Sequence, residues 1–308
     1  HLEHAMKRHI LLLMIIPFIF SCGTAGDTKI STTATQKYSG EIVPGKWKRD
    51  IAVPFSYNGE ASSARIQIFF PKDYAAGKKF RTIIALHQYD NGSRDWENGA
   101  GLESLANRYR FVIVCPAMGK TLYENSYYPE TVNKWNIIPG GKFIGEVLVP
   151  FLRGGFGLAS GRSNTGIMGV TVGAHGAILV AGTYADRFGA AAGLSGYYDP
   201  TIMQTSKMIE SVYGSYNNNR LRWETEDNAL RNAEKLSGVA VFLYHGGRND
   251  AFQEGQSRIM AIRLKQLQNK SSAYSITYSE QKSYQYGWTW WKIQVPAVME
   301  FFDAHLRE

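Results

Sequence analysis

Short, continuously apolar runs alternate with longer amphipathic stretches along most of the chain. Apolar runs of about four to eight residues are typical of strands that helices cover on both faces. The predicted strands are Ala64–Phe70, Thr82–His87, Phe111–Cys115, Gly166–Val170, Ala190–Leu194, Val239–Tyr244 and Ser275–Tyr278. The predicted helices are Leu102–Tyr109, Lys142–Phe151, Ala174–Tyr184, Asp227–Lys235, Gly255–Gln268 and Trp291–Leu306. This order predicts one α/β domain with a doubly wound, mostly parallel sheet, and a ligand site beyond the carboxyl ends of its strands.

The start of the chain has a different pattern. Lys7 and Arg8 precede the apolar run ILLLMIIPFIF (10–20), and Ser, Cys and Gly follow it. A charged start, an apolar run too short to span a bilayer and an exit of small residues are typical of a secretory signal. The stretch IFSC (19–22) also resembles the lipobox of bacterial lipoproteins, in which the cysteine, here Cys22, receives the lipid. A cleaved signal with an incidental cysteine is the alternative.

These patterns divide the chain into three parts. Residues 1–22 are interpreted as tag-like residues followed by a lipoprotein signal peptide. Residues 23–40 are small and polar without an apolar period, which predicts a flexible tether. Residues 41–308 form the single α/β domain. The predicted location is therefore outside the cytoplasm, with a lipid anchor at the bacterial cell envelope.

Composition excludes several classes of function. The formal net charge is +8, but the basic residues are scattered singly and do not form the dense clusters of a nucleic-acid-binding protein. The two cysteines are Cys22 and Cys115, so we expect the core, and not disulfides, to stabilise the domain. No histidine pair has the spacing of a zinc site and no glycine-rich phosphate loop occurs, so neither a metal nor a cofactor is predicted.

The stretch IMGVTVGAHGA (167–177) carries the clearest chemical signal. Gly169-Val-Thr-Val-Gly173 follows a predicted strand and precedes a predicted helix, which is the context of the G-x-S-x-G nucleophile elbow. Glycines flank the elbow because the sharp turn leaves no room for side chains. Thr171 stands where a serine hydrolase has its nucleophile.

Three longer stretches carry a family resemblance. They are IIALHQYDNGSRDWENGAGLESLANRYRFVIVCPAMG (83–119), IMGVTVGAHGAILVAGTYADRFGAAAGLSGYYDP (167–200) and VFLYHGGRNDAFQEGQSRIMAIRLKQL (241–267). From about Ile66 to the C-terminus the chain resembles the esterase-D/S-formylglutathione-hydrolase branch of the α/β-hydrolases. That branch includes the antigen-85 mycolyltransferases and the feruloyl, acetylxylan and tributyrin esterases. The resemblance implies an α/β-hydrolase fold and carboxylic-ester chemistry.

The resemblance also implies roles for individual residues. Thr171 takes the position of the nucleophile and Asp250 that of the triad acid, although Asp250 is alternatively a helix N-cap. Tyr286, in YGWTWW (286–291), takes the position of the histidine base. A phenol titrates near ~10 and stays protonated at neutral pH, so it cannot replace an imidazole as base. Residues 251–304 contain no histidine.

The oxyanion loop departs from the family pattern as well. The family's His-Gly pair appears here as His87-Gln88-Tyr89, and the glycine is lost. The backbone amides of Tyr89 and Val172 are the predicted oxyanion donors. Departures at the nucleophile, the base and the oxyanion loop together predict that the elbow is a relic.

Aromatic residues suggest what such a relic binds. The chain has 18 Tyr and 7 Trp, and many fall in segments predicted to rim the old cleft. Aromatic rings stack on sugars and aryl groups while their polar tips form hydrogen bonds, although core packing explains any single one. The predicted rim comprises Tyr123, Tyr127, Tyr128, Trp135, Tyr197, Tyr198, Tyr284, Tyr286, Trp288 and Trp290. The predicted ligand-binding residues are His87, Gln88, Trp135, Tyr197 and Trp288.

The histidines also have structural interpretations. His175 lies in the helix turn after the elbow, where we expect a structural role. His87 and His245 lie at strand ends, where hydrogen bonding beneath the site is the alternative to ligand contact. His305 belongs to the predicted terminal helix.

Three hypotheses for function follow. The first is a lipid-anchored protein of esterase-D-like fold with weak or lost hydrolase activity, which binds a carbohydrate, acyl or aryl ester ligand. The second is an active carboxylic-ester hydrolase that uses Thr171, Asp250 and a non-standard base. The third is a structural or interaction module of the cell envelope. A filled cleft beside an exposed apolar patch would favour this hypothesis.

Overall fold

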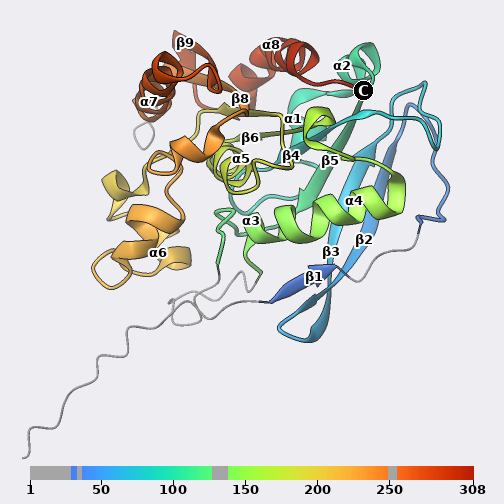
Figure 1. Cartoon of the computed structure of the whole chain (residues 1–308), viewed down its shortest axis with the longest axis horizontal. Helices are drawn as coiled ribbons and strands as arrows, with labels where there is room; N and C mark the ends of the chain where they lie inside the picture. The colour runs from blue at the N-terminus through green and yellow to red at the C-terminus, as the bar shows by residue number, and fades with distance from the viewer. Residues whose placement is uncertain (1–28, 33–36, 127–137, 249–254) are drawn as a thin grey trace, which may run out of the picture.

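The computed structural model describes residues 29–32, 37–126, 138–248 and 255–308 (Figure 1). Cys22, Trp135 and Asp250 lie outside the described residues, as do Tyr127 and Tyr128. The predictions made for these five positions therefore stay predictions.

The described residues form a nine-stranded sheet in the order β1-β2-β3-β5-β4-β6-β7-β8-β9. The strands β1 to β3 and the β3–β5 pair are antiparallel, and every neighbouring pair from β5 to β9 is parallel. The predicted doubly wound, mostly parallel sheet is thereby confirmed. The strands are β1 (Ile30–Thr32), β2 (Trp47–Tyr57), β3 (Glu60–Phe69), β4 (Arg81–Leu86), β5 (Phe111–Ala117), β6 (Thr165–Val170), β7 (Ala190–Leu194), β8 (Ala240–Arg248) and β9 (Ser275–Gln285).

Helices cover both faces of this sheet and bury two separate apolar layers. Adjacent residues of a strand point to opposite faces, so Ile84 of β4 belongs to one layer and Ile83 to the other. The first layer packs against α3 (Gly140–Phe143), α4 (Val149–Phe156), α5 (Val172–Thr183) and α7 (Gln256–Lys270). The second packs against α1 (Asp95–Ala100), α2 (Glu103–Tyr109) and α8 (Trp288–His305). Burial on both faces explains why the strands are continuously apolar in sequence.

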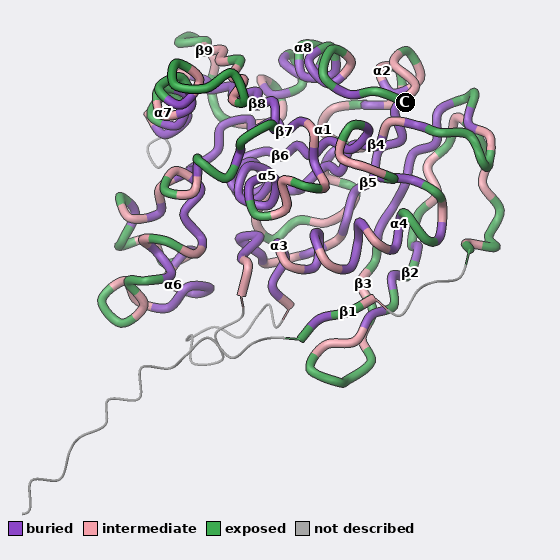
Figure 2. The backbone as a smooth tube through the Cα atoms, viewed as in Figure 1, coloured by how far each residue is buried: buried purple, intermediate pink, exposed green. Residues whose placement is uncertain are grey.

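Helix α5 is buried along nearly its whole length, as Figure 2 shows. Its sequence, VGAHGAILVAGT, has an apolar or small residue at almost every position and a single histidine. A helix that is apolar all round is buried on every side. This burial holds the elbow that precedes α5 in a fixed position against the sheet.

The predicted helix Asp227–Lys235 is wrong. The structure has turns there, and only a 3₁₀ turn, Ala233–Leu236, is helical. The Asn228 side chain donates to Asp199 Oδ1 and accepts the amide of Arg231. Asp and Asn side chains that form hydrogen bonds with nearby backbone groups compete with helix formation. Here such local hydrogen bonds form in place of the helix.

The N-terminal edge of the sheet was not predicted. Strand β1 lies within residues 23–40, the predicted tether, and pairs antiparallel with β2. Tyr38 stacks on Phe156 with the ring centroids 4.6 Å apart. In β2, buried Ile51, Val53 and Phe55 alternate with exposed residues, which is the pattern of a strand with one face exposed to solvent. Helix α6 (Lys207–Tyr213) and α1 were also missed.

Helix α8 is the longest helix described and contains a proline. It runs from Trp288 to His305, with Pro296 in its interior. A proline inside a helix cannot donate the hydrogen bond to the carbonyl four residues earlier, here that of Lys292. The residues before Pro296 carry Trp288 and Trp291, and those after it pack Phe301 and Phe302 on the sheet.

No helix in the described ranges is both long and apolar enough to cross a membrane.

Candidate active site

Thr171 occupies a sharp turn between β6 and α5. Its backbone has φ +53° and ψ −110°, a conformation that non-glycine residues rarely adopt and that costs roughly 1–3 kcal/mol. The Thr171 amide donates to the Leu194 carbonyl over 2.9 Å, and its carbonyl accepts from the His175 amide over 3.1 Å. The strained turn of a nucleophile elbow is therefore present with a threonine at its tip.

The two glycines of the motif are required by close backbone approach. A β-carbon at Gly169 would lie 2.0 Å from the Gly173 carbonyl oxygen, and one at Gly173 would lie 2.4 Å from the Leu86 carbonyl oxygen. Both clashes are with backbone atoms, which cannot move aside. The second also shows that the elbow packs directly against the end of β4.

Gly169→Ala is expected to lower the free energy of unfolding by about 3 kcal/mol, because overpacking against backbone cannot relax. Gly182→Ala in α5 is the matched control, because its β-carbon would meet only ordinary contacts, from 3.5 Å outward. Alanine there is expected to be neutral or stabilising by up to about 1 kcal/mol. Urea denaturation of both variants measures the difference. Equal stability of the two variants would contradict the steric role of Gly169.

The Thr171 hydroxyl is buried and turned toward its own helix. The side chain is 2% exposed, and Oγ1 accepts a hydrogen bond from the Val172 amide. In this conformation the Val172 amide, a predicted oxyanion donor, is occupied by the threonine itself. The Tyr89 amide, the other predicted donor, makes no hydrogen bond within the described ranges.

The His87 ring is held beneath the site by the backbone. Its Nδ1 donates to the Gln88 carbonyl over 2.6 Å, and its Nε2 accepts from the Met118 amide over 2.9 Å. Burial lowers the pKa of the His87 imidazole, so the ring is neutral. With both nitrogens occupied and 1% exposure, His87 has the structural role that was the alternative to ligand contact.

His175 is also neutral and enclosed. Its ring stacks on Tyr197 with centroids 4.4 Å apart and planes at 9°. Nδ1 lies 3.1 Å from the Tyr197 carbonyl and Nε2 lies 3.3 Å from the Tyr213 hydroxyl. Burial lowers the pKa of His175 to about 3. Tyr197 is fully buried, so it belongs to the core beneath the elbow and not to the predicted rim.

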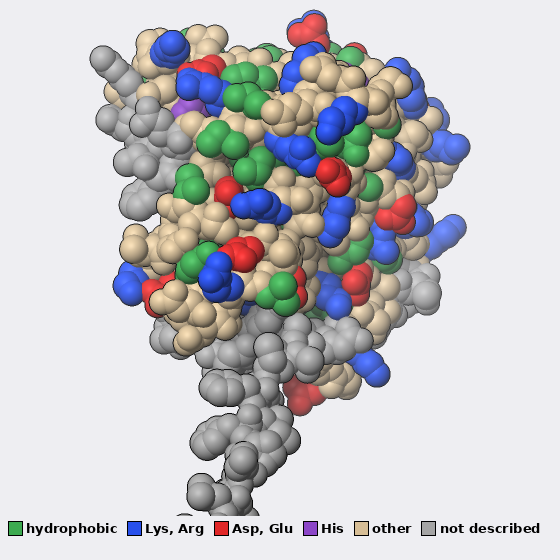
Figure 3. All heavy atoms as spheres, turned by 60° about the vertical axis from the view of Figure 1, so that its left-hand side comes forward, with side chains coloured by type: hydrophobic (Ala, Val, Ile, Leu, Met, Phe, Trp, Pro, Cys, Tyr) green, Lys and Arg blue, Asp and Glu red, His purple; other side chains and the backbone are tan. Residues whose placement is uncertain are grey.

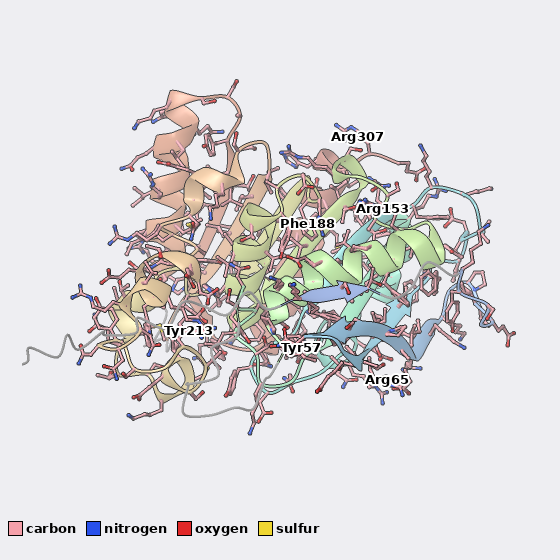
Figure 4. All side chains as sticks on the ribbon, turned by 60° about the horizontal axis from the view of Figure 1, so that its bottom comes forward. Tyr57, Arg65, Arg153, Phe188, Tyr213 and Arg307 are labelled. Atoms are coloured by element: carbon pink, nitrogen blue, oxygen red, sulfur yellow. The ribbon has the colours of Figure 1, made fainter. Side chains whose placement is uncertain are left out.

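Beyond Tyr213 lies a buried charge cluster that the sequence did not indicate. Arg222 Nε donates to Asp227 Oδ2 over 2.8 Å, and the two side chains are 2% and 0% exposed. The Arg222 guanidinium also lies over the Tyr213 ring, 4.7 Å from its centroid. Tyr213, the last residue of α6, is labelled in Figure 4. Burial raises the pKa of the nearby Glu124 carboxyl to about 7, against the opposing effect of the Arg222 charge.

Asp95 joins three segments at the mouth of the site. Its Oδ2 accepts the Gln88 amide over 3.1 Å, and its Oδ1 accepts the Trp288 indole N–H over 2.9 Å. Asp95 begins α1, Gln88 follows β4, and Trp288 begins α8. The carboxylate therefore holds the oxyanion loop and the start of the last helix together. Sequence analysis named Gln88 and Trp288 but missed Asp95.

Tyr286 lies in the loop before α8, where the resemblance places the base. Its ring is 42% exposed and stands edge-on to Trp291, with centroids 4.8 Å apart. The Trp291 indole donates to Ser195 Oγ over 3.0 Å. Tyr286 is thus held by an aromatic contact to a residue that is itself anchored at the end of β7.

The other two histidines of the described ranges lie away from the elbow. His245 is buried on β8 and pairs in register with Glu280 of β9. Neighbouring strands are about 4.8 Å apart, so His245, two strands from β6, is roughly 10 Å to the side. His305 lies at the end of α8 and bonds the Phe301 carbonyl. Among the described residues no group of His, Cys, Asp or Glu is arranged to hold a metal ion.

A family model described as "Putative esterase" matches residues 61–302. An acetyl esterase of Caldicellulosiruptor saccharolyticus is 25% identical over 245 residues, which cover 76% of this chain and 87% of that protein.

Solved structures show the same fold. The S-formylglutathione hydrolase FrmB of Staphylococcus aureus aligns with a TM-score of 0.64 and 15% identity, covering 84% of this chain and 99% of that one. MPT51 of Mycobacterium tuberculosis aligns with a TM-score of 0.63 and 18% identity, covering 80% and 94%.

Proposed function

Because this chain belongs to the family whose model is described as "Putative esterase" and has the α/β-hydrolase fold, we propose that it is an ester-binding protein whose hydrolytic machinery is degraded. It keeps the elbow and binds a carbohydrate, acyl or aryl ester in the old cleft. It turns that ligand over slowly or not at all, because Thr171 and Tyr286 replace the serine and the histidine of the triad.

The observation that carries this proposal is the environment of the Thr171 hydroxyl. Within the described ranges, its hydrogen bond is to the Val172 amide, and no imidazole takes part in it. Both nitrogens of His87 and of His175 are engaged elsewhere. A hydroxyl needs an adjacent base to become a nucleophile, because its proton must be removed during attack.

The test is the rate at which purified protein hydrolyses 4-nitrophenyl acetate. Wild type and Thr171→Ala are expected to have the same kcat/KM, close to the uncatalysed background. Thr171→Val is a second comparison, because it keeps the branched shape and removes only the hydroxyl. Turnover in the wild type that is lost in both variants would contradict the proposal. That result would establish the alternative, an active esterase with a threonine nucleophile, which the relationship to an acetyl esterase favours.

We also propose that the protein is exported and held at the cell envelope by a lipid on Cys22. The signal-like pattern of residues 1–22 supports this, and no nucleic-acid partner is proposed, because basic side chains are scattered over the face in Figure 3.

In a bacterial host fed a radiolabelled fatty acid, the wild type is expected to incorporate label and Cys22→Ala is not. Cys115→Ala is the matched control, since Cys115 is a buried thiol of β5. Label that persists in Cys22→Ala would contradict the anchor.

A further inference from the structure

A pocket of about 640 Å³ opens at the carboxyl ends of β4 and β5. Its walls are the loop after β4, the end of β5 at Ala117 and the first turn of α8. Its volume lies within the range of about 300–1,000 Å³ of small-ligand sites. In the sheet order β5-β4-β6, the pocket lies at the carboxyl ends of β5 and β4, and the elbow follows β6. The pocket and Thr171 therefore lie at the same edge of the sheet, and the two strands beneath the pocket are one and two positions from β6.

Two cations and one carboxylate line this pocket. Lys292 is exposed and makes no ion pair among the described residues. Arg94 is 62% exposed, and its contact with Glu97 is long, at 3.5 Å. Asp95, by contrast, already accepts hydrogen bonds from Gln88 and Trp288. The positive charges of the pocket are thus available to a ligand, whereas its negative charge is engaged within the protein.

The neutral lining is polar and accessible to solvent. The side chains of Asn91, Ser93, Asn98 and Thr289 line the pocket and form no hydrogen bond to other described residues. Amide and hydroxyl groups of this kind suit a ligand that carries several hydroxyls. The Trp288 indole forms an apolar wall, fixed by Asp95 and by close packing on Gly99, where a β-carbon would lie 2.1 Å from the ring.

We propose that this pocket binds the uronic-acid unit of an acidic glycan. The carboxylate of the uronate pairs with Lys292 and Arg94, and its ring hydroxyls bond the neutral side chains. Charge-assisted hydrogen bonds to a carboxylate are stronger than those to a neutral sugar. This inference rests on the proposed function, because it names the ligand class that brings an ester of the same glycan to Thr171.

The test compares two sugars that differ only at C6, which is a carboxylate in one and a hydroxymethyl group in the other. Isothermal titration calorimetry at low salt measures binding of methyl β-D-glucuronide and methyl β-D-glucoside to the wild type. The glucuronide is expected to bind about tenfold more tightly. Lys292→Gln and Arg94→Gln are each expected to reduce this preference several-fold. Lys265→Gln is the control, because Lys265 is an exposed lysine of α7, outside the pocket.

Equal affinity of the wild type for the two sugars would overturn the inference, as would an unchanged preference in Lys292→Gln. These variants lie on the surface, so a thermal melt at the wild-type temperature confirms that each is folded. The result is separable from the proposed function. Hydrolysis that depends on Thr171 would overturn the degraded triad and leave a glucuronide preference intact, whereas a missing preference with inert Thr171 would overturn only the uronate site.

Discussion

Thr171→Ser/Tyr286→His is expected to hydrolyse 4-nitrophenyl acetate at least about 100-fold faster than the wild type. A positioned general base contributes 10²–10⁴-fold to a rate, and the histidine introduces one where the resemblance places the base. Serine lacks the β-branch of threonine, which is sterically unfavourable at a backbone φ of +53°. The measurement is kcat/KM as a function of pH, with activity rising through the pKa of the new imidazole.

The matched control for this variant is Thr171→Ser/Tyr284→His. Tyr284 belongs to β9, two positions before Tyr286, and its ring lies tilted against Trp290 with centroids 4.7 Å apart. It introduces the same two residue types with the imidazole in a different place. Equal activity of the two double variants, or no gain in either, would contradict the role assigned to position 286.

Arg222→Met is expected to lower the free energy of unfolding by about 3–5 kcal/mol. It removes one partner of the buried pair and leaves the Asp227 carboxylate, 0% exposed, without its counter-charge. It also removes the guanidinium that bonds the Val212 carbonyl over 2.9 Å. Chemical denaturation followed by tryptophan fluorescence measures the loss.

Arg220→Met provides the control two residues away. Arg220 pairs with Glu224, but the two side chains are 64% and 37% exposed. Exposed pairs of this kind contribute about 0.3–0.5 kcal/mol. The double variant Arg222→Met/Asp227→Asn is expected to recover part of the stability lost in Arg222→Met, because the Asp227 side chain is then no longer a buried charge without its partner. If Arg222→Met were no more damaging than Arg220→Met, the buried pair would have no such role.

The central sheet could be predicted because its strands obey a single physical rule. Strands β4 to β8 are covered on both faces, so nearly every residue is apolar and the run is visible in sequence. One face of β2 is exposed to solvent, and its pairing with β3 has a register shift between Lys48 and Ile51. Its hydrophobic pattern is therefore harder to recognise in the sequence. Strand β1 has three residues, and its pairing with β2 is decided by tertiary contact alone.

The site could be predicted only in part. The elbow follows from local sterics, because both glycines are dictated by backbone atoms within a few residues or on the next strand. The burial of Tyr197 could not be predicted, because a tyrosine on a rim and one stacked on His175 look the same in sequence. Asp95 and Lys292 gave no signal, since their importance comes from the meeting of α1 with α8, nearly two hundred residues later.

Pro296 divides α8 into two segments that need not open together. Both segments bury side chains in the second apolar layer: Trp291 and Val295 come before Pro296, and Phe301 and Phe302 come after it. The first segment lacks the hydrogen bond that residue 296 would donate to the Lys292 carbonyl, and it carries the wall of the pocket. Local opening costs least free energy where the backbone makes the fewest protected hydrogen bonds. In native-state hydrogen exchange, we therefore expect the amides of α8 before Pro296, on the pocket side, to exchange faster than those after it.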